Sequence, residues 1–423
     1  MRLVQRHIIR PDHKYYQYFD QQCYLSKNLY NLSTYRYRQH FFQTGQKLSF
    51  NDLYHQVSKT SAYYALPNTK VAKQIIRRID QSWKGYFQAH KDWKRNPSKY
   101  LGEPKIPKYK DKEKGRYLLV FPIETISKPY LRKGIAKLTT CPIEFLTGLT
   151  EVVEVRVIPK TGCYVVEIVY EQESLKPSTD KAIAGGDIGL VNLITLTSNQ
   201  TGTKPLLIKG GALKAINTNY NKKKAKLQQE LEVKHGKKTS KRLNALTHKR
   251  NCRVDNYLHT VSRRVIDWCL LNSIGTLVIG KNDHWKQSIN IGKKNNQQFV
   301  SIPHARLIEM LCYKGELMGI KVVVTEESYT SQSSFLDFDT LPSYGEKKPK
   351  FSGKRIKRGL YKTSTGKLIN ADVNGSYNCI RKHLQQEKVK SNAFHSHDLM
   401  ALPFMPVTYD PLRTHNLNFL QIV

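Results

Sequence analysis

One carboxylate stands inside an apolar segment near the middle of the chain. Asp187 lies in residues 182–196, Ala-Ile-Ala-Gly-Gly-Asp-Ile-Gly-Leu-Val-Asn-Leu-Ile-Thr-Leu, which otherwise have the composition of a buried strand. A lone carboxylate is costly to bury unless something pairs with it. The glycines beside it leave room for a ligand or another backbone segment to approach. The pattern indicates an aspartate that is presented to a metal ion.

Two more positions offer carboxylates in similar settings. Asp372 opens an expected helix whose early residues are small, although an ordinary capping aspartate is the alternative interpretation. The strand predicted at residues 321–327 ends in Glu326 and Glu327, and side-chain alternation allows only one of them to face a common site. We take Glu327, with Glu326 as the fallback. The strand before it ends at Gly280 and supplies no acid.

These three acids fit the chemistry of phosphodiester hydrolysis. A two-metal site needs at least three carboxylates from different elements, and its ions clamp the attacking and leaving oxygens. We therefore predict that two Mg²⁺ ions activate a water molecule, and that the catalytic and metal-binding residues are Asp187, Glu327 and Asp372. His284 and His304 are left out, because the ions replace general acid–base groups in such a mechanism.

The charge of the chain indicates a polyanionic partner. There are 70 Lys and Arg residues against 33 Asp and Glu, a formal net charge of +37, and nucleic acid is the usual polyanion for such a protein. A membrane surface is the alternative, but no apolar stretch approaches the roughly 20 residues of a spanning helix. The seven cysteines are scattered without a CxxC pair, which is typical of reduced thiols. We expect a cytoplasmic protein with no membrane partner.

Several basic segments could contact phosphates, although a single such segment is most often a solvated face. Trp285 could stack on a base or a sugar, and packing in the core is equally probable for it. The candidate nucleic-acid-binding residues are Arg77, Arg78, Lys222, Lys223, Lys224, Lys237, Lys238, Trp285, Lys286, Lys354, Arg355 and Arg358.

Hydrophobic periodicity divides the chain into regions. Residues 1–10 and 116–177 have the alternation of strands and predict a small antiparallel β-barrel, with a hairpin turn at residues 159–162. Residues 11–115 predict an inserted helical region followed by a basic linker rich in Lys and Pro, which either is solvated or follows a phosphate backbone. Residues 391–423 lack clear periodicity and are expected to be a C-terminal tail.

Residues 178–390 predict an α/β domain. Its elements follow the order strand, hairpin, helices, strand, helix, strand, helix, with a basic helical insertion at about residues 213–270. Among two-metal nucleases this order, with an acid on the first strand, describes the RNase H-like (RuvC) fold.

Four segments together resemble the TnpB (OrfB) family of bacterial insertion sequences, which is related to type V CRISPR nucleases. They are residues 186–189, residues 282–286 with the loop 292–296, residues 327–331 and residues 370–375. The resemblance spans nearly the whole chain. It implies an RNA-guided, Mg²⁺-dependent DNA endonuclease with an Asp–Glu–Asp site, and identifies the N-terminal barrel with the family's wedge region and the helices with its recognition region.

The chain departs from the common family pattern at two places. The glutamate usually follows the strand that here ends before Gly280, whereas Glu327 matches a subgroup in which the glutamate has moved to the neighbouring strand. The common pattern also has two CxxC pairs that form a zinc ribbon. Here Ser334 and Asp337 occupy the first pair's positions, and no second pair exists between residues 347 and 369, so we do not expect zinc.

The resemblance implies two nucleic-acid partners: a guide RNA from the element's own end and a target DNA duplex, in a nucleoid-associated bacterial protein. A catalytically inactive RNA-guided DNA-binding repressor and a non-guided DNA-binding transposase remain the alternatives. The guide, the target-adjacent motif and the oligomeric state do not follow from the sequence.

Overall fold

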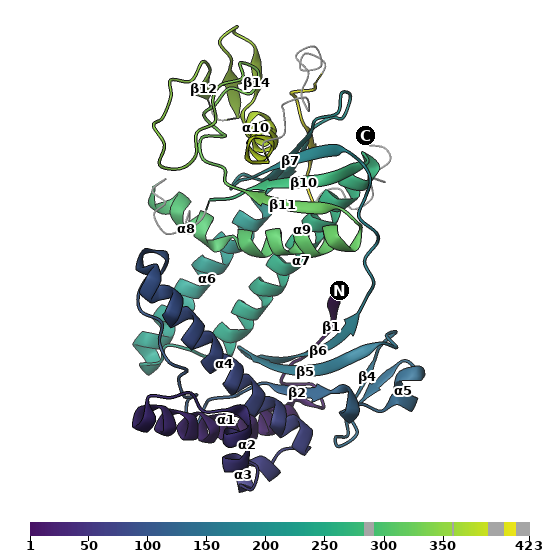
Figure 1. Cartoon of the computed structure of the whole chain (residues 1–423), viewed down its shortest axis with the longest axis vertical. Coiled ribbons are helices and arrows are strands. Elements are labelled where there is room, and N and C mark those ends of the chain that lie inside the picture. The colour runs from purple at the N-terminus through teal and green to yellow at the C-terminus, as the bar shows by residue number, and fades with distance from the viewer. Residues whose placement is uncertain (283–291, 358, 388–401, 412–423) are drawn as a thin grey trace. The chain divides into compact units, whose positions relative to one another are not determined.

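The computed structural model describes residues 1–282, 292–357, 359–387 and 402–411. The chain divides into two compact units, Met1–Gln172 and Glu173–Val423, here called unit 1 and unit 2. Figure 1 labels their helices and strands. Trp285, Lys286 and Arg358, three of the predicted nucleic-acid-binding residues, lie outside the described residues.

Unit 1 contains a four-stranded antiparallel sheet in the order β1-β6-β5-β2. The strands are β1 (Arg2–Ile9), β2 (Leu119–Pro122), β5 (Val152–Lys160) and β6 (Cys163–Glu171). The predicted hairpin joins β5 to β6, with Gly162 at φ 79°, a left-handed conformation that favours glycine. β1 and β2 are the two edge strands of this sheet and do not pair with each other. The described strands therefore do not confirm the closed barrel that the sequence predicts. A separate pair consists of β3 (Ile135–Lys137) and β4 (Glu144–Leu146).

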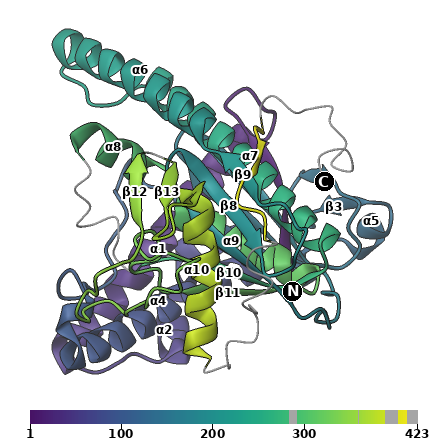
Figure 2. The same ribbon diagram turned by 90° about the horizontal axis from the view of Figure 1, so that it is seen from above.

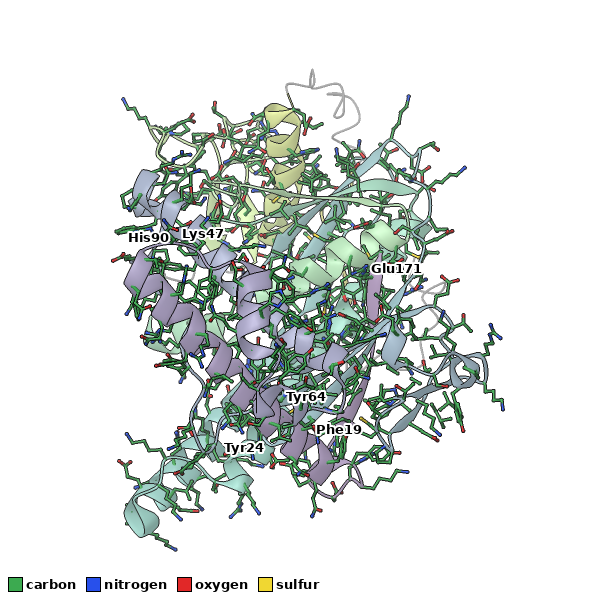
Figure 3. All side chains as sticks on the ribbon, turned by 60° about the horizontal axis from the view of Figure 1, so that its bottom comes forward. Phe19, Tyr24, Lys47, Tyr64, His90 and Glu171 are labelled. Atoms are coloured by element: carbon green, nitrogen blue, oxygen red, sulfur yellow. The ribbon has the colours of Figure 1, made fainter. Side chains whose placement is uncertain are left out.

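The helices of unit 1 pack around aromatic residues. They are α1 (Tyr16–Thr44), α2 (Phe50–Val57), α3 (Ser61–Tyr64), α4 (Thr69–Arg95) and α5 (Lys128–Arg132), with short 3₁₀ turns η1 (Pro97–Lys99) and η2 (Ile123–Thr125). Asn68 caps α4 by accepting a hydrogen bond from the Lys70 backbone at 2.7 Å. Trp83 of α4 is fully buried and stacks on Tyr37 of α1, with ring centroids 4.2 Å apart. Figure 3 displays the side chains of this unit, with Phe19 and Tyr24 of α1 labelled.

Unit 2 is built on a mixed six-stranded sheet in the order β11-β10-β7-β8-β9-β15. Its strands are β7 (Ala182–Ile188), β8 (Asn192–Ser198), β9 (Leu206–Lys209), β10 (Ile274–Gly280), β11 (Lys321–Thr325) and β15 (Val407–Tyr409). The first three are antiparallel neighbours, whereas β10 runs parallel to β7 and β11 runs parallel to β10. β15 comes from the segment expected as a tail and pairs with β9.

Helices cover both faces of this sheet. They are α6 (Gly211–His235), α7 (Lys241–Leu271), α8 (Lys293–Ser301), α9 (His304–Leu317) and α10 (Ala371–Gln386). Figure 1 shows α10 on one face and α7 and α9 on the other, and Figure 2 shows that α6 extends past the sheet. A three-stranded sheet of β12 (Lys354–Lys357), β13 (Leu360–Lys362) and β14 (Leu368–Asn370) precedes α10. Within the described parts, no helix is long and apolar enough to span a bilayer.

Candidate active site

Asp187 lies on central strand β7, on the face that α10 covers. Gly185 shares this face because side chains two residues apart point the same way. A Cβ on Gly185 would lie 2.1 Å from the Ser376 carbonyl oxygen, and the Ser376 hydroxyl donates to the Gly185 carbonyl at 2.8 Å. A Cβ on Gly375 would lie 3.0 Å from Asp187 Oδ2. The two glycines therefore allow α10 to rest directly on β7, beside the carboxylate.

Asp372 lies in the first turn of α10, but it does not cap the helix. Asn370 provides the cap, because its Oδ1 accepts hydrogen bonds from the backbone of Asp372 at 3.0 Å and of Val373 at 3.2 Å. The Asp372 carboxylate is thus free to make other contacts. Asn192 Nδ2 donates to Oδ2 at 2.6 Å, and Arg355 Nη2 forms an ion pair with Oδ1 at 3.1 Å.

Glu326 turns toward a buried lysine on α10. Lys382 Nζ lies 2.5 Å from Glu326 Oε2, and it donates to the carbonyl oxygens of Ser328 and Pro342 at 2.9 Å each. Lys382, whose side chain is 3% exposed, thus combines one ion pair with two hydrogen bonds to carbonyl oxygens. Glu326 is therefore held by a structural ion pair, away from its neighbour.

Glu327 points the opposite way and fills the space above Gly280. A Cβ on Gly280 would lie 2.9 Å from Glu327 Oε2 and 3.0 Å from Glu327 Cβ. The Glu327 backbone donates to Asn282 Oδ1 at 3.1 Å. Its Oε2 is buried and has no hydrogen-bond partner in the described structure. Strand β11 ends at Thr325, so both glutamates follow it and do not end it as the sequence predicts, and Glu327 occupies the volume that a side chain at the end of β10 would take.

The three carboxylates influence one another electrostatically. Burial raises the pKa of Asp187 to about 7, and the charge of Asp372 adds to this shift. Burial also raises the pKa of Glu327 to about 8, with further contributions from Asp187 and Glu326. Burial acts on Glu326 in the same direction, but hydrogen bonds from Lys382 and Ser328 outweigh it and lower its pKa. Asp187 is therefore coupled to both other members of the predicted site.

The chemistry of this donor set fits a hard divalent cation. Carboxylate oxygens are the ligands that Mg²⁺ prefers, and a cation would relieve both the repulsion and the unpartnered Glu327 Oε2. Within the described residues, however, no group of three or more His, Cys, Asp or Glu side chains is arranged to hold a metal ion. A cation at Asp372 would have to compete with Arg355 for Oδ1.

A polar stripe on α10 orients the segment that contains the glutamates. Asn374, Asn378 and Lys382 follow at steps of four, and each side chain is at most 3% exposed. Asn374 accepts from the Phe335 backbone at 2.9 Å, and both asparagines donate to the Ser333 carbonyl. The sequence analysis missed these residues and Asn192. Their helical spacing was the available signal, because polar residues on an inward-facing stripe must be hydrogen-bonded.

Hydrogen bonds join the segments in which the family pattern has its zinc ribbon. Asp337 accepts from the Ser334 hydroxyl at 2.5 Å and from the Ser364 hydroxyl at 2.6 Å. Asp339 accepts from the backbone of Ser334 at 2.8 Å and of Ser352 at 3.0 Å. These two carboxylates therefore connect the loop after Glu327 to both ends of the β12–β13 region.

The predicted nucleic-acid-binding residues are distributed over both units. Arg77 and Arg78 lie on α4 of unit 1. Lys222, Lys223 and Lys224 lie on α6, while Lys237 and Lys238 follow its end. Lys354 and Arg355 lie on β12, and all but Arg78 and Lys224 of these described cations are exposed. Of these residues, the structure brings Arg355 into contact with the carboxylates.

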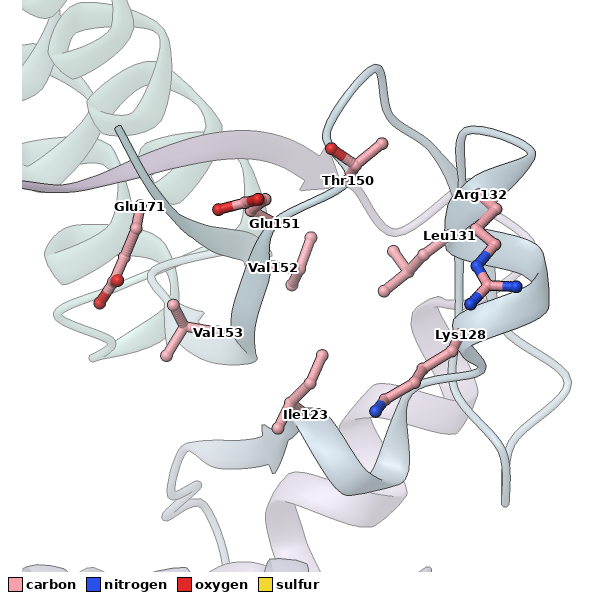
Figure 4. Close-up of a pocket in the computed structure, with 9 residues that line it drawn as sticks. All are labelled: Ile123, Lys128, Leu131, Arg132, Thr150, Glu151, Val152, Val153 and Glu171. Carbon is pink, nitrogen blue, oxygen red and sulfur yellow. The ribbon is translucent and has the colours of Figure 1, made fainter. Parts of the chain in front are cut away.

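A pocket of about 380 Å³ lies in unit 1. Figure 4 shows an apolar floor that includes Ile123 and Leu131, with Lys128 and Arg132 on one side and Glu171 on the other. Glu171 also pairs with Arg2 at 3.0 Å. None of the predicted catalytic acids lines this pocket.

Comparisons with known proteins agree with this architecture. Residues 167–286 match the OrfB_IS605 family model, described as a probable transposase, and residues 304–379 match the TNB domain of Cas12f1-like proteins. No curated protein matches the sequence. The chain is similar to the protein in a cryo-EM structure of a Cas12f1–sgRNA–target DNA complex, with 14% identity, a TM-score of 0.56 and coverage of 86% of this chain and 82% of that chain. It also matches the mini-RNA-guided endonuclease CRISPR-Casφ3, with 9% identity, a TM-score of 0.47 and coverage of 90% and 92%.

At such identities a structural likeness establishes the fold alone, an α/β fold that resembles Cas12f. The first family match includes Asp187, and the second includes Glu327 and Asp372. The two family matches confirm the resemblance to TnpB-like (OrfB) proteins that was stated from the sequence.

Proposed function

We propose that this chain is an RNA-guided DNA endonuclease of a bacterial insertion sequence, which hydrolyses phosphodiester bonds with two Mg²⁺ ions. The observation that carries the proposal is that the buried Asp187 of β7 interacts electrostatically with Asp372 in the first turn of α10 and with Glu327, which follows β11. Its partners are a guide RNA and a target DNA duplex. The likeness to a Cas12f1 complex with both nucleic acids and the net charge of +37 support this choice.

Unit 2 is then an RNase H-like (RuvC) nuclease domain. Support comes from the sheet, in which hairpins connect β7, β8 and β9 and two further parallel strands follow after helices. The acidic residue on β7 and the helix that covers it fit this assignment. In unit 1, the antiparallel sheet corresponds to a wedge region and the α1–α4 helices to a recognition region.

The carboxylates have different tasks in this mechanism. Mg²⁺ ions, when bound, activate the attacking water and stabilise the charge on the leaving oxygen. Asp187 would hold the metal together with the other two acids, because it interacts electrostatically with each of them. Glu327 and Asp372 complete the site from either side. Asp187 and Glu327 must lose their protons before they bind a cation, so metal affinity falls as the pH decreases below about 8.

The assignment of Glu327 rather than Glu326 has two supports. Lys382 neutralises Glu326 and keeps it in an ion pair. Glu327 instead reaches over Gly280 and is coupled to Asp187. From the segment after β11, Glu327 thereby places its carboxylate where a side chain at the end of β10 would otherwise lie.

The proposal is tested by guided cleavage. The protein is purified after co-expression with the flanking sequence of its element, the bound RNA is sequenced, and a DNA duplex that matches this RNA is incubated with and without Mg²⁺. We expect a defined bound RNA and Mg²⁺-dependent cutting of the matched duplex alone, which Asp187→Ala abolishes.

Other outcomes identify the alternatives. Guided binding without cutting under any metal would point to an inactive DNA-binding repressor. A protein free of RNA that binds DNA irrespective of guide would point to a non-guided transposase. Either result would contradict the proposed function.

A further inference from the structure

The basic linker of unit 1 is an ordered strip along α1, although it belongs to no helix or strand. Asn31 Nδ2 donates to the Lys110 carbonyl at 3.0 Å, and the Lys110 backbone donates back to Asn31 Oδ1 at 2.8 Å. Lys27, which is 1% exposed, donates to the Lys112 carbonyl at 2.5 Å. Tyr30 donates to the Lys108 carbonyl at 3.1 Å. We call residues 105–114 the lysine strip.

An ion pair fixes the end of the lysine strip. Arg116 donates to both oxygens of Asp20 on α1, from Nε at 2.9 Å and from Nη2 at 2.8 Å. Tyr117 then donates its backbone N–H to the Cys23 carbonyl at 2.9 Å. The strip is therefore attached to α1 through alternate carbonyls and at its end, and a solvated linker would not make these contacts.

The attachment brings an exposed tyrosine beside an exposed phenylalanine. Tyr109 of the lysine strip is 44% exposed, and Phe42 of α1 is 59% exposed. The guanidinium carbon of Arg38 lies 4.8 Å from the Tyr109 ring and 5.5 Å from the Phe42 ring. Tyr35, 47% exposed, precedes Arg38 by one helical turn. Two aromatic rings from distant parts of the chain thus share one cation and remain open to solvent.

Cations surround these rings. The lysine strip contains Asp111 and Glu113, and it also contains five exposed lysines: Lys105, Lys108, Lys110, Lys112 and Lys114. Asp111 accepts from the backbone of Glu113 and Lys114, so it serves a local turn. The local excess of positive charge suits a phosphate backbone.

We propose that the aromatic pair Phe42–Tyr109, with Arg38 and the lysine strip, binds unpaired nucleotides of a single-stranded nucleic acid. Bases would stack on the two rings, and Arg38 and the lysines would contact the phosphates. A base within a duplex has both faces covered by its neighbours, so it cannot stack on a protein ring. The inference rests on the proposed function for the class of partner, and it specifies a single strand at this surface.

Binding to short labelled probes tests the inference. The full-length protein, freed of co-purified nucleic acid by high-salt washing, is titrated with a fluorescent single-stranded oligothymidine and with a blunt duplex of equal length at the same ionic strength. We expect Phe42→Ala/Tyr109→Ala to weaken single-strand binding by about 30-fold or more, the effect of losing stacking on two bases. Duplex binding should change by less than about twofold, because it depends on the cations.

Three controls separate stacking from other effects. Tyr109→Phe keeps the ring and should bind like the wild type. Tyr64→Ala removes a ring that is 65% exposed on α3 (Figure 3) and should leave both affinities unchanged. Thermal unfolding checks that each variant is folded.

Two results would overturn the inference: unchanged single-strand binding by the double variant, or equal weakening for both probes. Its failure is distinguishable from failure of the proposed function. The affinities are measured without Mg²⁺ and without cleavage, so ring-dependent binding by a protein that never cuts DNA would contradict only the proposed nuclease.

Discussion

Glu327 depends on a missing side chain at position 280. The Cβ that Gly280 lacks would lie 2.9 Å from Glu327 Oε2, so the two positions compete for one volume. A carboxylate can therefore be supplied from either strand end, provided that the other position is small.

We expect Glu327→Ala to abolish cleavage and Gly280→Glu/Glu327→Ala to restore part of it. The new carboxylate starts from β10 and reaches the volume that the alanine has vacated, although Cys379 Sγ, 2.9 Å from the new Cβ, must shift. Single-turnover cleavage rates should show recovery of about tenfold or more, equal to about 1.4 kcal/mol of transition-state stabilisation. Gly280→Gln/Glu327→Ala is the matched control without a charge. Equal recovery by the control would contradict the role of the carboxylate.

The raised pKa values of Asp187 and Glu327 predict how stability varies with pH. Both values, about 7 and about 8, exceed the ordinary 3.8 and 4.5. The folded chain therefore holds more protons than the unfolded chain between about pH 4 and pH 8, and without metal the free energy of unfolding falls as the pH rises. In EDTA at about pH 8.5, Asp187→Asn and Glu327→Gln should each raise the melting temperature by about 2 °C or more.

At about pH 4.5 the same variants should show little gain, because the wild-type side chains are already largely neutral there. Thermal scans at both pH values make the comparison. A lower melting temperature of both variants at the higher pH would contradict the raised pKa values.

At the scale of elements, the contact between β7 and α10 determines whether the carboxylates meet. Gly185→Ala would put a Cβ 2.1 Å from the Ser376 carbonyl oxygen, and neither backbone can yield alone. We expect a loss of about 3 kcal/mol in the free energy of unfolding, measured by urea denaturation, together with slower cleavage as α10 moves away from Asp187. Gly211→Ala, which has nothing within 4 Å of its Cβ, is the control. Similar stability of the two variants would contradict the close contact.

The buried ion pair between Lys382 and Glu326 connects α10 to the end of β11. Lys382→Met leaves the Glu326 carboxylate and two carbonyl oxygens without their partner. We expect a loss of about 3–5 kcal/mol in the free energy of unfolding. Lys382→Met/Glu326→Gln should lose less, because no charge remains buried. Equal losses for the single and the double variant in urea denaturation would contradict the ion-pair account.

Local patterns in the sequence predict some of these elements and not others. The apolar strand with Asp187, the hairpin of β5 and β6 and the helical order of unit 2 follow from residue periodicity. β15 does not, because a three-residue strand takes its hydrogen bonds from β9, about 200 residues earlier. Likewise, the alternation of strands in unit 1 does not determine whether their sheet closes. Closure depends on pairing between edges.

The candidate site was likewise only partly predictable from the sequence. Asp187 and Asp372 stand out by their local setting, whereas the choice between Glu326 and Glu327 depends on Lys382, more than 50 residues later in the chain. Arg355, a predicted nucleic-acid contact, pairs with Asp372, which no local pattern indicates. Such partners become visible only when the helix and the sheet are assembled.

At the scale of the whole molecule, the positive charge is widely distributed, whereas the predicted catalytic carboxylates are concentrated in one unit. The net charge of +37 is spread over both units, whereas the three predicted catalytic acids gather in unit 2. A basic protein with one acidic centre can hold a polyanion broadly and cut it at a single place. In this account, base pairing with the guide supplies the sequence specificity, and the protein supplies the adjacent motif contact and the chemistry.

The most direct test is the single-turnover cleavage rate of guide-matched DNA in Mg²⁺ for the wild type, Glu327→Gln and Glu316→Gln, the last an exposed acid on α9. The account predicts that Glu327→Gln loses cleavage by about a hundredfold or more while it still binds the guide and the target, and that Glu316→Gln cuts like the wild type. Undiminished cleavage by Glu327→Gln would contradict the proposed site.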